Sequence, residues 1–129
     1  MHPSLNRIIL YVKDVQISCA FYERYFGFVA THDPDDRLIE LTPPAGGVVL
    51  MLHKAAKSVK TGQVTVKLVF DIEDIDGFKE HCLSQGLAFG STHQANGYSF
   101  ANAKDPDGNS ISISSRAFVG RPNPIEAVR

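Results

Sequence analysis

The side chains in this sequence that commonly take part in chemistry include five histidines, which are spread along the chain. None has a neighbour at the short spacing typical of zinc ligands, so the pattern gives little support to a zinc centre. His53 and His93 are the two that we expect near a binding site, because an imidazole can act there as a general base or a hydrogen-bond donor. A surface role remains open for both. We expect His2, His32 and His81 on the surface or on a helix face.

The sequence lacks a phosphate-binding loop, a dinucleotide glycine fingerprint, a nucleophile elbow and a zinc pattern of cysteines. Cys19 and Cys82 both fall in predicted helices, so we expect two small core residues in a reducing cytoplasm. A net charge of −1 and a pI near 6.5 give no attraction to nucleic acid or to an anionic membrane. The apolar runs are far shorter than the roughly 20 residues of a spanning helix. Residues 1–7 lack the order of a signal peptide.

An internal repeat determines which elements must position these side chains. Asp14 and Asp74 lie 60 positions apart, and each follows an apolar run and precedes an amphipathic stretch. These stretches end at Gly27 and Gly86, which suit the left-handed conformation that ends many helices. The aspartates are good helix N-caps, because a carboxylate accepts hydrogen bonds from the free N–H groups of the first turn. The chain therefore repeats one structural unit.

Each half is predicted to contain a strand, a helix and three further strands, a βαβββ order. In the first half we expect strands at 6–12, 28–32, 38–42 and 48–53 and a helix at 15–25. In the second half we expect strands at 63–72, 87–92, 97–103 and 109–115 and a helix at 75–85. We interpret 1–129 as one domain, with repeat one at 6–53, a linker at 54–62, repeat two at 63–116 and an irregular tail at 117–129.

A small sheet with one helix cannot bury both of its faces. We therefore expect the halves to pair and to curve into one concavity, which gives an α+β fold with a mostly antiparallel sheet. The motifs that support this fold are Val12–Val15 with Phe21–Phe28, and the turn Asp105–Asn109 near the end. In these motifs the chain resembles the vicinal oxygen chelate superfamily over about residues 6–116. That superfamily includes glyoxalase I, bleomycin-resistance proteins and extradiol dioxygenases, so the resemblance implies the fold but not one activity.

The resemblance also implies where a metal would be held. The family's ligand positions on the first and last strands of each half correspond here to Arg7, Met51, Lys67 and Ser112. Two cations, a thioether and a hydroxyl are poor ligands for a divalent first-row metal, which prefers imidazole and carboxylate. We therefore predict that the usual metal site is absent and that the protein needs no cofactor.

Two explanations remain for the basic residues at these positions. Arg7 and Lys67 can form a cationic floor for a carboxylate, a phosphate or an enolate. Alternatively, they pair with neighbouring acids such as Asp71 or Glu40. Strand parity directs further side chains toward the same cavity, a mixture of apolar and polar groups that is typical of ligand sites; these are Ile9, Tyr11, Val49, His53, Val69, Ser110 and Ser114. Tyr11 and Tyr98 are possible stacking residues, although core packing also explains them.

The predicted function is metal-independent binding of a small anionic or planar organic molecule, in a homodimer of the bleomycin-resistance type. The predicted ligand-binding residues are Arg7, Ile9, Tyr11, Met51, His53, Lys67, Val69 and Ser112. The alternative is a metal-dependent lyase, epimerase or dioxygenase that uses His53, Glu40 or His93; a metal-free enzyme with His53 or Lys67 as base is a variant. A third class is a partner-binding domain whose cavity is filled by Tyr11, Met51 and Phe100.

Overall fold

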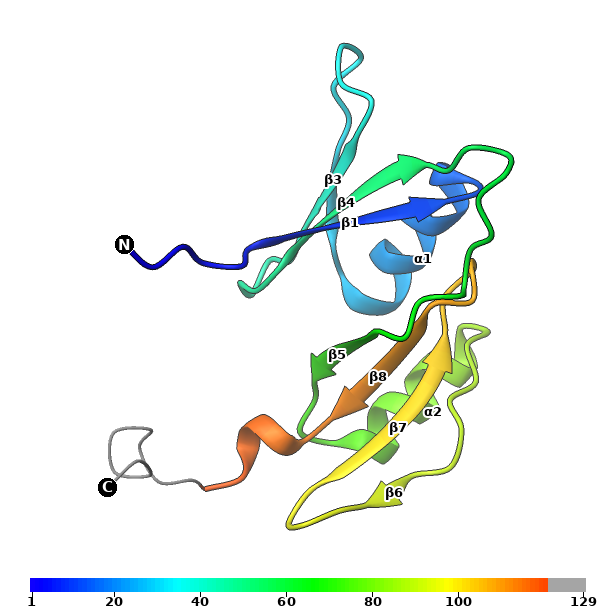
Figure 1. Cartoon of the computed structure of the whole chain (residues 1–129). Helices are drawn as coiled ribbons and strands as arrows, with labels where there is room; N and C mark the ends of the chain where they lie inside the picture. The colour runs from blue at the N-terminus through cyan, green and yellow to red at the C-terminus, as the bar shows by residue number, and fades with distance from the viewer. Residues whose placement is uncertain (121–129) are drawn as a thin grey trace. The chain divides into compact units, whose positions relative to one another are not determined.

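The two halves of the chain form the same series of elements in the computed structural model, which describes residues 1–120 (Figure 1). The first half contains β1 (Arg7–Val12), α1 (Val15–Phe26), β2 (Val29–Thr31), β3 (Ile39–Thr42) and β4 (Val49–Lys54). The second contains β5 (Lys67–Asp71), α2 (Ile75–Ser84), β6 (His93–Gln94), β7 (Ser99–Lys104) and β8 (Ser110–Ser114). A short 3₁₀ helix, η1 (Arg116–Phe118), follows at the start of the predicted tail. Residues 121–129 of that tail lie outside the described part.

Each repeat builds a four-stranded sheet with the same strand order. The orders are β1-β4-β3-β2 and β5-β8-β7-β6, so the last strand of each repeat lies beside the first. In the first sheet β1 and β4 are parallel, whereas β3 is antiparallel to both of its neighbours, β4 and β2. The α+β class and the two βαβββ repeats are thereby confirmed. The concave cavity remains a prediction.

The aspartates cap the helices as the sequence predicts. The Asp14 carboxylate accepts hydrogen bonds from the backbone N–H groups of Gln16 and Ile17 at 3.0 and 3.1 Å. The Asp74 carboxylate accepts one from Gly77 at 3.1 Å. Gly27 adopts a φ of +71°, the left-handed geometry expected at the end of α1.

Two strands of the second repeat differ from the prediction. The strand expected at 63–72 begins only at Lys67, and Val64 and Val66 before it are exposed. The strand expected at 87–92 does not form, and the two-residue strand β6 follows it instead. The Leu87 N–H donates to the Cys82 carbonyl at the end of α2, so this segment begins as part of a helix terminus. Side-chain pattern alone could not reveal that bond.

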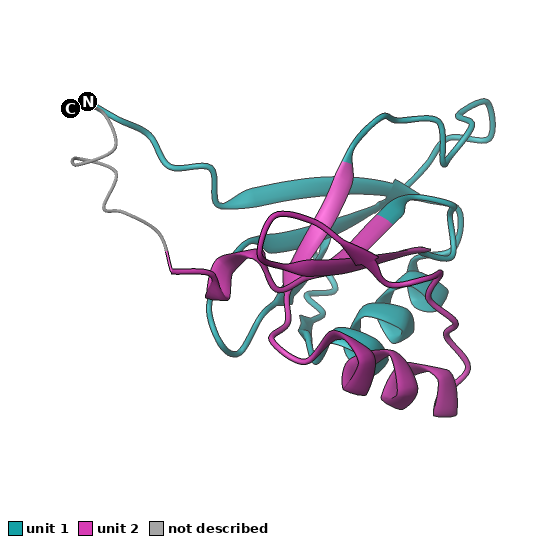
Figure 2. Ribbon diagram, turned by 90° about the horizontal axis from the view of Figure 1, so that it is seen from below, with its two compact units in different colours: residues 1–66, 104–110 teal, residues 67–103, 111–129 magenta. Residues whose placement is uncertain are grey.

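The residues fall into two compact units (Figure 2). Unit 1 contains residues 1–66 and 104–110, and unit 2 contains residues 67–103 and 111–129, of which 111–120 are described. In unit 1 the helix α1 packs on β3 and β4. Its core is made of Val12, Cys19, Tyr22, Phe28, Leu41, Leu50 and Leu52, and that of unit 2 is made of Ile75, Cys82, Ala101, Ile111 and Ile113.

The turn between β7 and β8 belongs to unit 1, although it lies in the second repeat of the sequence. The Tyr22 hydroxyl donates to Asp105 Oδ2 at 2.7 Å. The Asp107 carboxylate accepts hydrogen bonds from the Lys13 N–H at 2.9 Å and from the Ser18 hydroxyl at 3.2 Å. Both carboxylates are buried, so the turn forms a polar part of the interior of unit 1.

Candidate functional site

The sheet of unit 1 has one open face, on the side that α1 does not cover. Arg7, Ile9 and Tyr11 are exposed along β1. The residues that alternate with them are less exposed, and the last of these, Val12, is buried. On β4 the neighbours of Ile9 and Tyr11 are Met51 and His53. Five predicted ligand-binding residues therefore share this face, which combines apolar walls with polar groups.

Arg7 has a carboxylate partner on this face. Its Nε lies 3.5 Å from Glu40 Oε1, with both side chains partly exposed. Arg7 is on β1 and Glu40 on β3, so the ion pair extends across β4, which lies between them. The pair adds at most about 1 kcal/mol of stability at such exposure. Its main consequence is that the guanidinium charge is already balanced.

His53 has a defined hydrogen-bonding pattern. Its Nδ1 lies 2.8 Å from the Lys54 carbonyl oxygen, and a carbonyl can only accept, so Nδ1 carries the proton in this bond. Nε2 is then an acceptor in the neutral ring. The ring centroid is 5.4 Å from that of Tyr11, in a tilted arrangement. His53 can therefore accept a hydrogen bond, or a proton, from a molecule on the open face.

The remaining predicted ligand-binding residues lie in unit 2. Lys67 Nζ donates to Asn102 Oδ1 at 3.1 Å and lies 5.9 Å from the centroid of the Phe100 ring. Val69 is exposed on the same strand. Ser112 is buried, and its hydroxyl donates to the Ala101 carbonyl at 3.0 Å. Five of the predicted residues thus lie in unit 1 and three in unit 2, and whether they line one site stays a prediction.

Two polar residues of unit 2 were missed by sequence reasoning. Asn102 could have been found from the parity of its strand, because it alternates with the buried Ala101. Arg116 follows the last strand, where no periodic pattern applies, and its Nη1 donates to the Tyr98 hydroxyl at 3.0 Å. His93, which was predicted near the site, pairs with Phe100 across β6 and β7, with ring centroids 5.1 Å apart.

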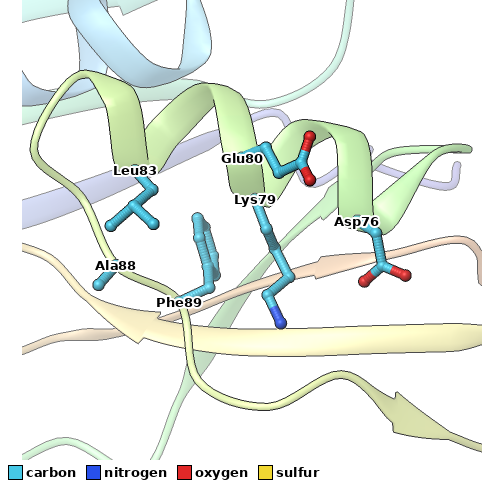
Figure 3. Close-up of a pocket in the computed structure, with 6 residues that line it drawn as sticks. All are labelled: Asp76, Lys79, Glu80, Leu83, Ala88 and Phe89. Atoms are coloured by element: carbon cyan, nitrogen blue, oxygen red, sulfur yellow. The ribbon is translucent and has the colours of Figure 1, made fainter.

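Unit 2 also contains a depression of about 400 Å³ beside α2 (Figure 3). Its lining residues are Asp76, Lys79, Glu80, Leu83, Ala88 and Phe89, none of which was predicted as a site residue. Lys79 Nζ donates to the Thr92 hydroxyl, which in turn donates to Asp76. These polar groups satisfy one another, so we assign no chemistry to this depression.

The two thiols are poor nucleophiles. Burial raises the pKa of the Cys19 thiol to about 11, and its hydrogen bond to Glu23 adds to that shift. Burial also raises the pKa of the Cys82 thiol. Because the thiolate is the reactive form, neither cysteine is suited to covalent chemistry near neutral pH.

The residues that we predict at the family's metal positions do not fit a divalent cation. The guanidinium of Arg7 and the ammonium of Lys67 are donors only, and they offer no lone pair to a metal. Met51 supplies a soft thioether, and Ser112 is engaged with a carbonyl. Within residues 1–120 no cluster of three or more His, Cys, Asp or Glu side chains has metal-binding geometry. We therefore derive no step through a metal.

The sequence and the fold of this chain are similar to those of known proteins. A sequence model described as the glyoxalase/bleomycin resistance protein/dioxygenase superfamily matches residues 4–113. The chain belongs to this superfamily. Among curated relatives, the uncharacterized protein YetH of Bacillus subtilis (strain 168) is 28% identical over 114 residues, which cover 84% of this chain and 95% of YetH.

Solved structures of the superfamily show the same fold. TnmS3, an antibiotic-binding protein from Streptomyces sp. CB03234, matches with a TM-score of 0.73 and 21% identity over 87% of this chain and 94% of its own. A lactoylglutathione lyase from Agrobacterium tumefaciens matches with a TM-score of 0.69 and 20% identity over 92% and 97%. A binding protein and an enzyme thus share the architecture, so the site must decide between them. Among the helices of residues 1–120, none has the length and apolar character needed to cross a membrane.

Proposed function

We propose that this superfamily member binds a small anionic or planar organic molecule without a metal ion. The observation that carries the proposal is the open face of unit 1. Ile9 and Tyr11 are 43% and 54% exposed there, although large apolar side chains are usually covered. The face also offers an acceptor at His53 Nε2 and the thioether of Met51. Apolar side chains with a few placed polar groups are typical of ligand sites.

Similarity is compatible with binding, and the chemistry of the site favours binding over metal-dependent catalysis. TnmS3, which has this fold, is an antibiotic-binding protein. The side chains that we predict at the metal positions are poor ligands for the ion on which a metal-dependent lyase, epimerase or dioxygenase relies. The same positions hold the cations Arg7 and Lys67, and Lys67, whose hydrogen-bond partner is a neutral amide, favours an anionic ligand. We also propose that the protein is a cytoplasmic homodimer.

Elemental analysis tests the metal independence. Protein without an affinity tag would be incubated with a mixture of divalent metals, desalted and analysed. We expect far less than one equivalent of any metal, because the donor set is cationic. Near one equivalent of bound metal would overturn the proposal and support the metal-dependent lyase, epimerase or dioxygenase.

Thermal-shift measurement with a panel of planar and anionic compounds tests the binding. We expect anionic members to raise the melting temperature in the presence of EDTA, since ligand binding stabilises the native state by mass action. The double variant Arg7→Ala/Lys67→Ala should lose this shift while its own melting temperature stays close to that of the wild type. If the double variant does not fold, the cations are structural, and the anion-binding part of the proposal fails.

A further inference from the structure

The two repeats place a basic residue in the same way but balance its charge differently. In unit 1 Arg7 extends from the first strand, across the fourth strand, to Glu40 on the third strand. In unit 2 Lys67 extends likewise from β5, across β8, to Asn102 on β7. The partner is a carboxylate in the first repeat and a neutral amide in the second. The positive charge is therefore uncompensated only in the second of these two contacts.

This uncompensated charge lies at one end of a row of aromatic rings. Lys67 Nζ lies 5.9 Å from the Phe100 ring centroid, and the Phe100 centroid lies 6.3 Å from that of Tyr98. The His93 ring lies on Phe100 at 5.1 Å, tilted by only 31°. Along β7, Phe100 and Asn102 alternate with the buried Ala101, so this aromatic row lies on the side of the sheet away from the core.

A second cation lies at the far end of the row. The guanidinium carbon of Arg116 is 5.1 Å from the Tyr98 ring centroid, and its Nη1 donates to the Tyr98 hydroxyl. The Tyr98 hydroxyl is a neutral partner for Arg116, as the Asn102 amide is for Lys67. In the part of the chain that the structure describes, neither Lys67 nor Arg116 has an ion pair with a carboxylate. A row of three rings thus has an unbalanced cation at each end.

We infer that this row, formed by His93, Tyr98 and Phe100 between Lys67 and Arg116, is the part of unit 2 that binds a planar aromatic carboxylate. The ligand's ring would stack on Phe100 and its neighbours, because offset aromatic pairs are favourable. Its carboxylate would meet Lys67 or Arg116, and a charge-assisted hydrogen bond would form without competition from a protein acid. The inference rests on the proposed function and assigns the anion contact to unit 2 rather than to Arg7.

Calorimetric titration with 2-naphthoate tests this assignment. Wild-type protein should bind it saturably, whereas 2-naphthamide, which lacks the charge, and decahydro-2-naphthoate, which lacks the planar ring, should bind at least about tenfold more weakly. The variants Lys67→Gln and Phe100→Leu should each weaken binding by about fivefold or more. Because Lys67 is exposed, we expect Lys67→Gln to fold. It therefore still tests the inference if Phe100→Leu fails to fold.

The matched control is Lys57→Gln, which removes an exposed cation of the linker, outside the row, and should change the affinity by less than about twofold. Lack of saturable binding of 2-naphthoate to the wild type would overturn the inference, as would unchanged affinity in Lys67→Gln. Binding that depends on Arg7 or Tyr11 instead would overturn the inference but leave the proposed function standing. Failure of every compound in the thermal-shift panel would overturn both.

Discussion

At the scale of single residues, the interior of unit 1 depends on one phenol. The Tyr22 hydroxyl donates to the buried Asp105 carboxylate at 2.7 Å, and Tyr22 itself is fully buried. The substitution Tyr22→Phe removes this donor and leaves the carboxylate with fewer partners, so we expect the free energy of unfolding to fall by about 1–3 kcal/mol. Urea denaturation measures the change. Tyr11→Phe is the matched control; because Tyr11 is 54% exposed, its effect should stay within about 0.5 kcal/mol.

Cys19 gives the stability a dependence on alkaline pH. Its pKa rises from an ordinary 9.0 to about 11 in the folded protein, so the thiol is protonated in both states well below pH 9. Between pH 9 and 11 the unfolded chain releases this proton while the folded chain keeps it, and the free energy of unfolding must therefore decrease as the pH rises. Tyr22, whose pKa burial raises above its ordinary 10.0, adds a further decrease once the pH passes about 10.

The variant Cys19→Ala isolates the contribution of the thiol. We expect its unfolding free energy, measured in urea at pH 8 to 10.5, to decline less steeply than that of the wild type. The comparison uses the slope, because the substitution also changes packing at every pH. Equal slopes for the two proteins would show that the thiol does not produce this dependence.

At the scale of elements, the linker between the repeats is fixed against the turn at 105–109. A Cβ on Gly62 would lie 2.8 Å from the Asp107 carbonyl oxygen, and its φ is +76°. Gly62→Ala therefore combines a left-handed backbone with a clash against the main chain. We expect a loss of about 2–4 kcal/mol in the free energy of unfolding, of which about 1–2 kcal/mol comes from the backbone.

The variant Gly46→Ala separates these two effects. Gly46 has a similar φ of +87°, but a Cβ added to it would meet no atom within 4 Å. Gly46→Ala should therefore lower the free energy of unfolding only by the cost of the left-handed backbone, about 1–2 kcal/mol. Thermal unfolding of both variants gives the difference between their losses of unfolding free energy. Equal losses would mean that the linker moves away from the turn at no cost in stability.

At the scale of the whole molecule, two strands connect the units. Residue 104 at the end of β7 and residue 110 at the start of β8 belong to unit 1, while the rest of both strands belongs to unit 2. Because β7 and β8 each continue from one unit into the other, unfolding of either unit would disturb strands that both units share. We expect one cooperative transition, with a calorimetric enthalpy equal to the van't Hoff enthalpy. Two separate transitions would show that the units unfold independently.

Much of the fold could be predicted from local pattern, because its signals lie within short segments. Asp14 and Asp74 with their amphipathic stretches determined the two helices, since a cap and a hydrophobic stripe act within a few turns. The alternation along β1 likewise determined that Arg7, Ile9 and Tyr11 share a face. The strand predicted at 87–92 was wrong, because the hydrogen bond of Leu87 to Cys82 lies outside any periodic pattern.

The tertiary structure decided what each of these side chains contacts. The sequence alone left Arg7 and Lys67 equivalent, since both stand at the same place in their repeats. Only strand order and cross-strand packing give Arg7 the carboxylate of Glu40 and Lys67 the amide of Asn102. Likewise, only tertiary packing places Asp105 and Asp107 of the second repeat against α1 of the first. A local pattern sets the direction of a side chain, but the charge around it depends on residues far away in the sequence.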